Sequence, residues 1–569
     1  MSVAAPVQRR RWVVKTPDPE KVDALRQSLK IHPALCRLLV QRGIESYEDA
    51  FDFFRPTLSQ LHDPMLMKDM GKAVARIDAA ISRDEHILVY GDYDVDGTTS
   101  VALVYSFLKD FYPHVDFYVP NRYTEGYGVS MRGVEWAKEH GFGLIIALDC
   151  GITAVSQVAF AKSLGIDFII CDHHLPTDER PDAVAVLDPK QPECNYPFDE
   201  LSGCGIGYKL LQALSLHLDI PEAALHKYLD LVVVSIASDI VPMVGENRVL
   251  AYYGLRKLNE NPLPGLKALI DVSGLQKELS ITDIVFGLGP RINAAGRMDD
   301  ARHAVSLLIS DGQPGVKAQA GVLDGHNKNR READENITLE ALAILEAAPA
   351  DLKATVVFQP DWHKGVIGIV ASRLIETYHR PTIVFTQSGE YISGSARSIP
   401  GYNIYKAIEA CGDLLEQFGG HKYAAGLVLR RDKYEEFKER FQQHVAETID
   451  EELLVPEVRI DAEIGLKDIT GKFYNIIRQF APFGPQNMRP VFLSRGMKAE
   501  ARVVGEQHLK LKLRQNSSVG IEGIAFEMAD AEEWVNGDLV DVCYTIDVNS
   551  FRGYSSIQLV VKDIKPSVE

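Results

Sequence analysis

Short apolar runs alternate with helical patterns from residue 86 onward, and this alternation most constrains how the chain can fold. Four apolar runs have the length of a strand: residues 86–90, 115–119, 144–148 and 168–171. The segments between them carry helical periodicity, at residues 98–108, 130–139 and 154–164, and two further helices are expected at 208–218 and 228–237. Strands that alternate with helices form parallel sheets covered by helices on both faces. We therefore expect an α/β domain built on a parallel sheet.

The pattern changes twice beyond residue 311. A charged helical stretch without a strand signal extends from Val316 to about Ala347, as expected of a connecting helix. A second α/β unit begins at Ala354 and ends near Ile449. Beyond Pro456 the strands are short and alternating, which predicts a small β-barrel or sandwich. A chain of 569 residues is too long for one core, so several domains are expected.

The composition excludes a disordered chain, a collagen-like repeat and a disulfide-rich scaffold. Hydrophobic residues make up 46% and charged residues 25%, as in ordinary globular proteins. The seven cysteines form no C-x-x-C pair, and no apolar run approaches the ~18 residues that a membrane span needs, so we expect a cytoplasmic protein. The net charge of −18 argues against a nucleic-acid partner, but only weakly, because charges beyond about 8 Å are screened and a local basic groove can prevail.

Acidic residues gather where the first apolar run ends. The run continues into Gly91-Asp92-Tyr93-Asp94-Val95-Asp96-Gly97. Three carboxylates in five residues repel one another unless a cation neutralises them. The spacing matches the start of a calcium loop of the EF-hand type, but that loop needs a glutamate at position 103, where Leu103 stands. A plain acidic turn remains an alternative to a metal site at this stage.

Two more apolar runs end in the same way. Asp149 follows residues 144–148, and Asp172-His173-His174 follows residues 168–171. Ligands bind at the carboxyl ends of strands in open parallel sheets. Asp239 closes an apolar helix, where an acid is unfavourable without a cation partner. Carboxylates with imidazole suit Mn²⁺ or Mg²⁺, and the ligands suffice for two ions, which predicts a two-metal hydrolase.

These residues resemble those of the DHH phosphoesterase superfamily, whose name derives from the triplet 172–174. Within it the chain is similar to the RecJ single-strand-specific exonucleases from about residue 55 onward. The likeness rests on segments that follow one another in the family's order: residues 91–97, the strand before Asp149, and residues 172–174, 238–239, 289–297, 394–398, 418–421 and 481–484. In two places the chain departs from the family: Tyr90 stands where many members have His, and residues 484–488 read Gly-Pro-Gln-Asn-Met rather than Gly-x-Gly-Asn-Pro.

The resemblance implies a 5′→3′ exonuclease on single-stranded DNA that works with Mn²⁺ or Mg²⁺ in repair and recombination. It implies five metal ligands: Asp94, Asp96, Asp149, His173 and Asp239. It places His174 beside the scissile phosphate and, because Tyr90 replaces a histidine, gives Asp92 a share in the site. The implied parts are an N-terminal segment (1–70), a DHH domain (71–310), a connecting helix (311–350), a DHHA1-like domain (351–452) and an OB-fold-like barrel (453–569).

Contacts to a DNA strand need cationic and hydrogen-bonding side chains. Arg291, Arg297, Ser395 and Arg397 lie among small residues that let a phosphate approach, and His421 follows two glycines in what we expect to be a phosphate-binding turn. Arg122 matches a family position near the 5′ end. In residues 508–514 the alternation puts leucines on one face and Lys510 and Lys512 on the other, where a barrel of this type binds single strands. Structural pairing of the arginines and a merely solvated strand face are the competing interpretations.

Two other functions stay open from the sequence. One is a DHH-family phosphodiesterase on short oligonucleotides, against which the C-terminal β unit argues. The other is a non-catalytic single-stranded-DNA-binding relative, against which the retention of all five ligand positions argues. Family membership also suggests a single-strand-binding protein and a helicase as partners, and a monomer is the default expectation.

Overall fold

The computed structural model describes residues 10–312, 314–349, 351–516, 520–551 and 554–567, which group into two compact units. The parallel-sheet unit consists of Glu48–Lys328 and Gln479–Arg489. The second unit consists of the chain up to Tyr47, Asn329–Arg478 and the chain from Pro490 onward. This grouping divides the expected N-terminal segment 1–70 after Tyr47, and the five-part division made from the sequence stays a prediction.

A five-stranded sheet forms the centre of the parallel-sheet unit. Its strand order is β3-β2-β4-β5-β6, and every neighbouring pair is parallel. The strands are β2 (His86–Gly91), β3 (Val115–Tyr118), β4 (Phe142–Leu148), β5 (Asp167–Cys171) and β6 (Ala185–Leu187). The predicted parallel sheet is thereby confirmed. The sequence did not predict β6, because three residues are too few to show a strand pattern.

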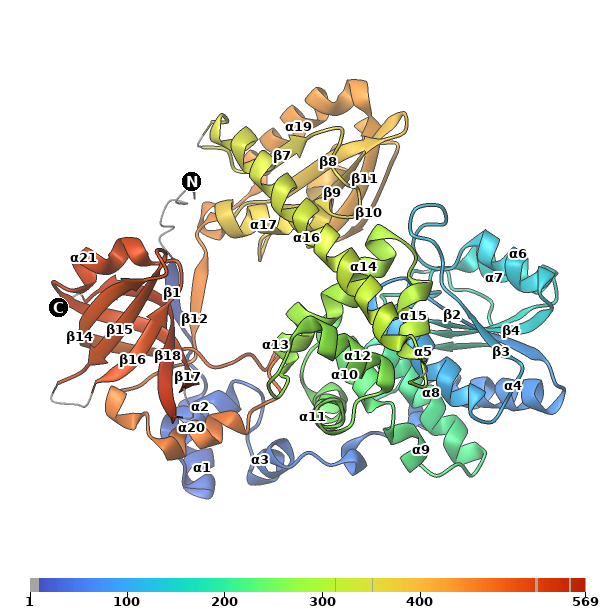
Figure 1. Cartoon of the computed structure of the whole chain (residues 1–569), viewed down its shortest axis with the longest axis horizontal. Helices are drawn as coiled ribbons and strands as arrows, with labels where there is room; N and C mark the ends of the chain where they lie inside the picture. Colours follow the sequence, from blue (N-terminus) through green and yellow to red (C-terminus); the bar gives the residue numbers. More distant parts are fainter. Residues whose placement is uncertain (1–9, 313, 350, 517–519, 552–553, 568–569) are drawn as a thin grey trace. The chain divides into compact units, whose positions relative to one another are not determined.

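Helices cover both faces of this sheet (Figure 1). Alternate residues of each strand point to opposite faces, so every strand contributes to two cores. Ile87 and Val89 pack into the core with α4 (Met70–Ser82), α5 (Val95–Lys109) and α8 (Gly203–His217). Leu88 and Tyr90 pack into the other core with α6 (Met131–Glu139) and α7 (Val155–Ser163). The strands are therefore buried on both sides, which explains why they read as unbroken apolar runs.

Two helices begin earlier than the periodicity indicated. In α5 the Asp94 side chain accepts a hydrogen bond from the Gly97 N–H, so the helix starts at Val95 and takes Asp96 into its first turn. In α8 the Ser202 side chain caps the helix in the same way, and the helix starts at Gly203 rather than at 208. Both helix N-termini therefore lie at the sheet edge where the acidic residues gather.

The parallel-sheet unit contains further helices beyond those that cover the sheet. They are α3 (Tyr47–Phe54), which begins at the unit boundary, α9 (Ala223–His226), α10 (Leu229–Ser238), α11 (Gly245–Glu260), α12 (Pro264–Ser273), α13 (Ile281–Asp283), α14 (Gly289–Met298) and α15 (Arg302–Leu308). The connecting helix is α16 (Val316–Glu346), which has 31 residues and begins in the parallel-sheet unit. Among the described residues, no helix combines the length and the apolar character that crossing a membrane requires.

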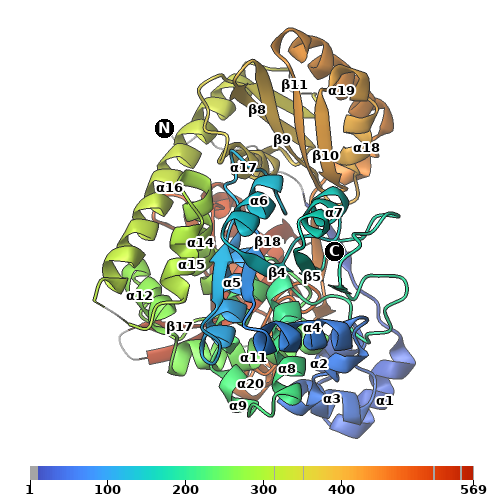
Figure 2. The ribbon, with the colours of Figure 1, turned by 90° about the vertical axis from the view of Figure 1, so that its right-hand side faces the viewer.

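The second unit contains a mixed sheet of order β10-β11-β9-β8-β7, in which only β7 and β8 are parallel. One face of the sheet packs against α18 (Ile404–Glu409) and α19 (Tyr434–Thr448), and the other against α17 (Ile367–Tyr378) and part of α16 (Figure 2). The strands are β7 (Thr355–Phe358), β8 (Thr382–Ser388), β9 (Tyr391–Arg397), β10 (Gln417–His421) and β11 (Ala424–Arg430).

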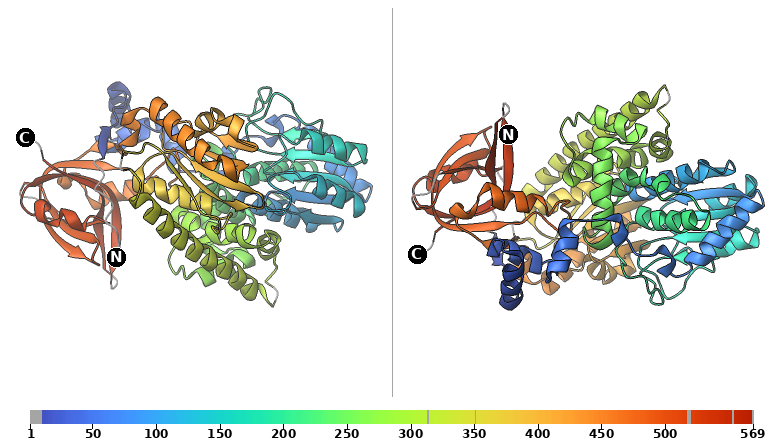
Figure 3. Two further views of the ribbon diagram at one scale, coloured as in Figure 1. Left: turned by 90° about the horizontal axis from the view of Figure 1, so that it is seen from above. Right: turned by 90° about the horizontal axis from the view of Figure 1, so that it is seen from below.

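The C-terminal strands form a closed barrel (Figure 3), which is one of the two architectures, barrel or sandwich, that the sequence predicted. The ring is β14-β15-β16-β18-β17, and it closes because β17 also pairs with β14. These strands are β14 (Phe492–Val504), β15 (His508–Arg514), β16 (Ile521–Ala525), β17 (Leu539–Phe551) and β18 (Tyr554–Pro566). Near the chain's start, β1 (Arg11–Val14) pairs in parallel with β12 (Glu457–Ile460), a long-range contact that no local pattern could predict.

Candidate active site

Four of the five predicted metal ligands, Asp96, Asp149, His173 and Asp239, meet at the carboxyl edge of the parallel sheet. We call this edge the acidic edge. The Nε2 atom of His173 lies 3.1 Å from Asp149 Oδ1, 3.6 Å from Asp239 Oδ2 and 3.8 Å from Asp96 Oδ2. Asp149 follows β4 and His173 follows β5 after one residue, while Asp96 lies in the first turn of α5 and Asp239 closes α10. Parallel strands end at the same edge, so residues that are far apart in sequence become neighbours here.

Four hydrogen bonds hold the Asp96 carboxylate in place. The backbone N–H groups of Gly203 and Cys204, at the start of α8, donate to it at 2.7 and 2.8 Å. The hydroxyls of Ser235 and Ser100 donate to Oδ1 at 2.8 and 3.4 Å. The positive end of α8 favours a negative charge at this point. Asp96 is therefore a fixed anion aimed at the site.

Asp149 is held by close backbone packing. Its φ angle is +58°, a left-handed conformation that aspartate tolerates better than most residues. A Cβ on Gly203 would lie 2.6 Å from Asp149 Cβ, so only glycine lets α8 approach this closely. The two elements can then present Asp96 and Asp149 to the same imidazole.

Several buried polar atoms of this edge make no hydrogen bond with any residue that the structure describes. They are both ring nitrogens of His173, Asp149 Oδ1 and Asp92 Oδ2. Burying a polar atom without a partner is costly, and a cation between these atoms would satisfy them together. Carboxylate oxygens with one imidazole are a donor set for Mn²⁺ or Mg²⁺, so the residues present fit the predicted ions.

Electrostatics at the edge also favour a bound cation. Burial and, next, the charge of Asp96 raise the pKa of Asp149 well above its usual range. The same two causes raise the pKa of Asp94, and they raise that of Asp239 to about 8. Burial and the charge of Asp94 raise the pKa of Asp92. The carboxylates are close enough to repel one another, and a divalent ion relieves that repulsion.

His174 belongs to a different hydrogen-bonded group. Its Nδ1 lies 2.7 Å from Asp172 Oδ1, and its Nε2 lies 3.0 Å from the Tyr127 hydroxyl. Burial lowers the pKa of His174, but the hydrogen bond and charge of Asp172 raise it more, to about 9. Burial raises the pKa of Asp172, but His174 and the Ile152 N–H hold it at about 2. The pair is thus a carboxylate and an imidazolium, which places a positive charge next to the metal ligands.

Tyr90 takes no part in this edge. Its side chain is fully buried in the core on the other face of the sheet and stacks on Tyr118. Its hydroxyl donates to the Gly128 carbonyl and accepts from the Ser130 N–H, both at 3.1 Å. Asp92, directly beyond β2, is also fully buried, and its Oδ1 accepts from the Gly128 N–H at 3.3 Å.

Sequence reasoning missed several residues of the site. Tyr127 contacts His174, and Ser235 contacts Asp96. In the sequence, Tyr127 looks like an ordinary loop residue and Ser235 like an ordinary residue of an apolar helix, so no local pattern indicated either contact. Asp188 follows β6, and the charge of Lys190 acts on both His173 and Asp239. The rule that strand ends carry the site would have found Asp188, had β6 been recognised.

The predicted DNA contacts of the parallel-sheet unit lie on helix and loop. The glycine-rich segment that carries Arg291 and Arg297 is the helix α14, not an open loop. Arg291 forms an ion pair with Asp324 at 2.9 Å and donates to the Gly287 carbonyl, so its contacts favour the structural interpretation. The Arg297 carbonyl accepts from the Tyr123 hydroxyl. Arg122 lies over the ring of Tyr93, 4.8 Å from its centroid.

Ser395, Arg397 and His421 share one face of the second unit's sheet. Arg397 pairs across β11 with Ala424, which pairs with His421, and Arg397 Nη1 donates to Ser395 Oγ at 3.2 Å. His421 is the last residue of the edge strand β10, and the turn at residues 422–423 that leads into β11 follows it directly. A Cβ on Gly368, in α17, would lie 2.9 Å from Ser395 Oγ. Small residues therefore do surround this arginine, and a helix N-terminus lies beside it.

The basic face of β15 is interleaved with acids. The leucines of β15 are buried and Lys510 and Lys512 point outward, as the alternation predicted. Lys510 forms an ion pair with Glu522 at 3.1 Å, and Lys512 lies opposite Glu500 and Glu522. The face is thus of mixed charge, which favours the solvated-face interpretation more than the sequence did.

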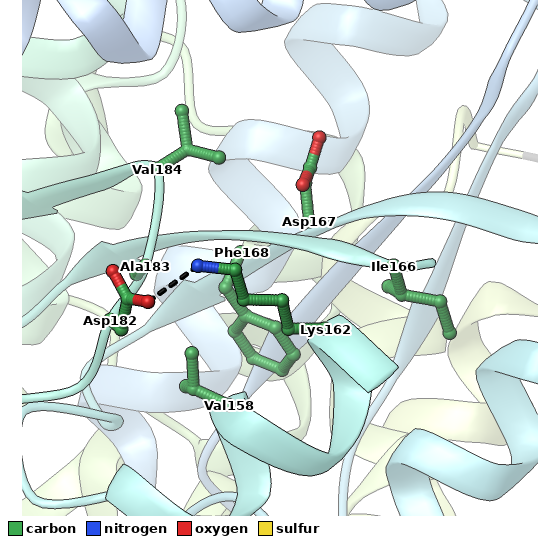
Figure 4. Close-up of a pocket in the computed structure, with 8 residues that line it drawn as sticks. All are labelled: Val158, Lys162, Ile166, Asp167, Phe168, Asp182, Ala183 and Val184. Carbon is green, nitrogen blue, oxygen red and sulfur yellow. Dashed lines mark hydrogen bonds and ion pairs between the residues drawn. The ribbon is translucent and has the colours of Figure 1, made fainter. Parts of the chain in front are cut away.

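A pocket in the parallel-sheet unit lies away from the acidic edge (Figure 4). It is lined by residues of α7 and by the chain around the amino ends of β5 and β6, with an ion pair between Lys162 and Asp182. The carboxyl ends of the strands carry the predicted ligands, so this pocket is on the opposite edge and holds none of them.

Comparisons with known proteins agree with this geometry. Three family models match the chain: the DHH family N-terminal domain over residues 86–236, the DHHA1 domain over 351–447 and the RecJ OB domain over 460–563. The single-stranded-DNA-specific exonuclease RecJ of Bacillus subtilis is 37% identical over 97% of this chain and 70% of its own length. That of Escherichia coli is 34% identical over 94% of this chain and 96% of its own.

The chain belongs to the RecJ family. A crystal structure of RecJ from Thermus thermophilus in complex with Mn²⁺ matches 99% of this chain and 80% of that chain, with a TM-score of 0.85 and 27% identity. A crystal structure of exonuclease RecJ bound to manganese matches 69% of this chain and 97% of that chain, with a TM-score of 0.61 and 32% identity. The predicted order of DHH, DHHA1-like and OB-fold-like domains is therefore confirmed as the RecJ architecture.

Proposed function

We propose that this protein is a metal-dependent exonuclease that hydrolyses the phosphodiester bonds of single-stranded DNA from the 5′ end, in DNA repair and recombination. The relatives named above carry this activity in their names, without its direction. One observation of this chain supports it most: Asp96, Asp149 and Asp239 converge on His173 at a sheet edge where several buried nitrogen and oxygen atoms form no hydrogen bond with any described residue.

Asp94, Asp96, Asp149, His173 and Asp239 are the proposed ligands of two Mn²⁺ or Mg²⁺ ions. When bound, such ions supply Lewis-acid activation of the phosphate and of a water molecule. Asp92 joins the site in this proposal, because its Oδ2 is buried and unused within the described chain while the Tyr90 hydroxyl is engaged elsewhere. Asp96 would be the most rigid ligand, since four hydrogen bonds fix its orientation.

His174 is the proposed contact to the scissile phosphate. Asp172 holds its imidazole in the protonated form and fixes the ring by its Nδ1, so Nε2 can donate to a phosphate oxygen. Tyr127, which contacts Nε2, would give up this hydrogen bond when the phosphate binds. A cationic donor at this position stabilises the charge that develops on the phosphate during hydrolysis.

The proposed DNA contacts are Ser395, Arg397 and His421 in the second unit, and Arg122 and Arg297 in the parallel-sheet unit. Arg397 has the small neighbours and the adjacent helix N-terminus that a phosphate requires. We leave Arg291 out, since its charge is paired internally. Lys510 and Lys512 stay as secondary contacts of the barrel, and the ion pair between Lys510 and Glu522 must break before Lys510 can bind DNA.

The test uses a single-stranded oligonucleotide with a 5′ phosphate and a 3′ label, incubated with Mn²⁺. The wild type should give a ladder that shortens from the 5′ end. Asp94→Asn should abolish the ladder, and the matched control Asp116→Asn, an exposed aspartate of β3, should retain it. Intact DNA that is nevertheless bound would favour the non-catalytic alternative. Cleavage of dinucleotides with no action on the long strand would favour the short-oligonucleotide alternative.

Further statements belong to the same proposal. We expect a cytoplasmic monomer that cooperates with a single-strand-binding protein and a helicase. Light scattering of the purified chain tests the monomer. Co-sedimentation with a single-strand-binding protein, in the absence of DNA, tests that contact.

A further inference from the structure

A second cluster of metal-binding side chains lies outside the acidic edge, where three helices of the parallel-sheet unit meet. Asp299 directly follows α14, His303 lies in the first turn of α15, and His326 lies on α16. The Asp299 Oδ2 atom is 3.3 Å from His303 Nδ1 and 3.6 Å from His326 Nε2. One donor atom from each residue lies within 4.8 Å of the other two.

The distances in this cluster match those between ligands of one metal ion. Hydrogen bonds between a ring nitrogen and an oxygen have lengths of about 2.7–3.2 Å. Ligand atoms at ~2.0–2.1 Å from a tetrahedral Zn²⁺ are about 3.3–3.4 Å apart, close to the two distances observed.

The Nε2 atom of His326 gives a second, independent indication. It is buried, and no described residue forms a hydrogen bond with it. A buried ring nitrogen without a partner is costly, whereas a metal ion would use its lone pair. His303 and Asp299 are about half exposed, which leaves room for water as a further ligand.

We propose that Asp299, His303 and His326 bind Zn²⁺ or a similar late first-row ion such as Ni²⁺ or Co²⁺. Two imidazoles and one carboxylate form the ligand set of many zinc sites, and the affinity of such nitrogen-rich sites rises towards the end of the first transition row. The acidic edge offers mainly carboxylate oxygens instead, which suit Mn²⁺ and Mg²⁺. The chain would then carry two kinds of metal site with different preferences.

An ion at this cluster would join α14, α15 and α16 at one point. Asp299 lies two residues beyond Arg297, whose carbonyl accepts a hydrogen bond from Tyr123. The ion would therefore hold the end of α14 and the first half of the connecting helix together. Binding to the folded state alone stabilises the fold by mass action, so the ion should raise the melting temperature of the protein.

Zn²⁺ binding to the full-length, chelator-treated protein tests the proposal by calorimetry, with three proteins compared. The first is the wild type, and the second is His303→Gln with His326→Gln. The third is a matched control, His217→Gln with His226→Gln. His217 lies 3.3 Å from Asp78, and His226 Nε2 lies 3.6 Å from Glu222 and is also buried without a hydrogen bond to any described residue. Each control histidine thus has a carboxylate beside it, but the described residues place no second imidazole in its group.

The wild type and the control should bind one more Zn²⁺ than the double variant, since all three share the acidic edge. Zn²⁺ should also raise the melting temperature of the wild type and the control more than that of the double variant. Equal Zn²⁺ stoichiometry in all three proteins would overturn the proposal.

His303→Gln alone is a second variant, which keeps the test valid if the double variant fails to fold, because His303 is an exposed residue. Loss of a residue that only orients a metal ligand weakens metal binding by ~10–100-fold. Loss of the ligand His303 itself should therefore weaken Zn²⁺ binding at this cluster by at least that factor. No DNA is used, so the result is independent of the proposed nuclease activity.

Discussion

Ser235→Ala is the substitution that best tests how the acidic edge is held. The Ser235 hydroxyl is fully buried, donates to Asp96 Oδ1 at 2.8 Å and lies 2.7 Å from Ser202 Oγ. Ser202 in turn caps α8, whose first N–H groups also bind Asp96. The substitution removes one donor to the buried Asp96 carboxylate, together with the contact to Ser202, and leaves the other three hydrogen bonds to Asp96 in place.

The size of the effect follows from these contacts. A hydrogen bond to a charged group contributes about 1.5–3 kcal/mol. Both Ser235 and Asp96 are buried, so solvent screens little of this contribution. We expect the free energy of unfolding to fall by roughly 1.5–3 kcal/mol. Loss of a partner that orients a metal ligand weakens metal binding by about 10–100-fold, so Mn²⁺ affinity should fall in that range.

Denaturant unfolding and Mn²⁺ titration measure the two effects separately. Ser215→Ala is the matched control, because Ser215 lies on α8, is also buried, and its hydroxyl forms no hydrogen bond with any described residue. This control should leave both quantities close to the wild type. If Ser235→Ala lowers stability while Mn²⁺ affinity stays unchanged, then Asp96 is a structural anion and its assignment as a ligand is wrong.

Three further predictions concern charged side chains. In the metal-free protein the His174 imidazole should titrate near 9; because this pKa is raised, the stabilisation from Asp172 is complete below the ordinary value of ~6.5 and is lost as the pH rises through about 9. Asp172→Asn should move the NMR titration midpoint to about 6.5 or lower, and an unmoved midpoint would contradict the pairing. Arg291→Gln should lower stability by roughly 1–3 kcal/mol through the loss of Asp324 and leave DNA affinity unchanged. Arg397→Gln should instead reduce the slope of log DNA affinity against log salt concentration by about 0.7 for single strands, as measured by fluorescence anisotropy with chelator present. If Arg291→Gln reduces this slope and Arg397→Gln only lowers stability, then Arg291 is the phosphate contact and Arg397 the structural residue.

The acidic edge could be predicted because its signals are local. A strand buried on both faces reads as an apolar run, and the residue that follows the run lies at the sheet edge, whichever strand it belongs to. Asp149 and His173 could be placed in this way without any tertiary information. The resemblance to RecJ then supplied the ligand roles, including that of Asp239, whose helix gave only a weak electrostatic signal.

Contacts between distant segments could not be predicted in this way. The donors that hold Asp96 come from α8 and α10, more than a hundred residues away in sequence. Arg291 has the surroundings of a phosphate contact in the sequence, but the folded chain pairs it with Asp324. The pairing of His421 with Ala424 of β11 likewise depends on how the chain folds back.

The sequence by itself determined the α/β architecture, the β-rich C-terminal part and the positions of Asp149 and His173 after their strands. Strands that are buried on both faces read as apolar runs, and the ends of these runs can be located in the chain. Only the tertiary structure decided which charges are paired, which buried atoms make no hydrogen bond to any described residue, and that Asp299, His303 and His326 lie close together. The physical reason is that a hydrogen bond or a ligand set depends on distances of a few ångströms between segments whose separation along the chain carries no information about their separation in space.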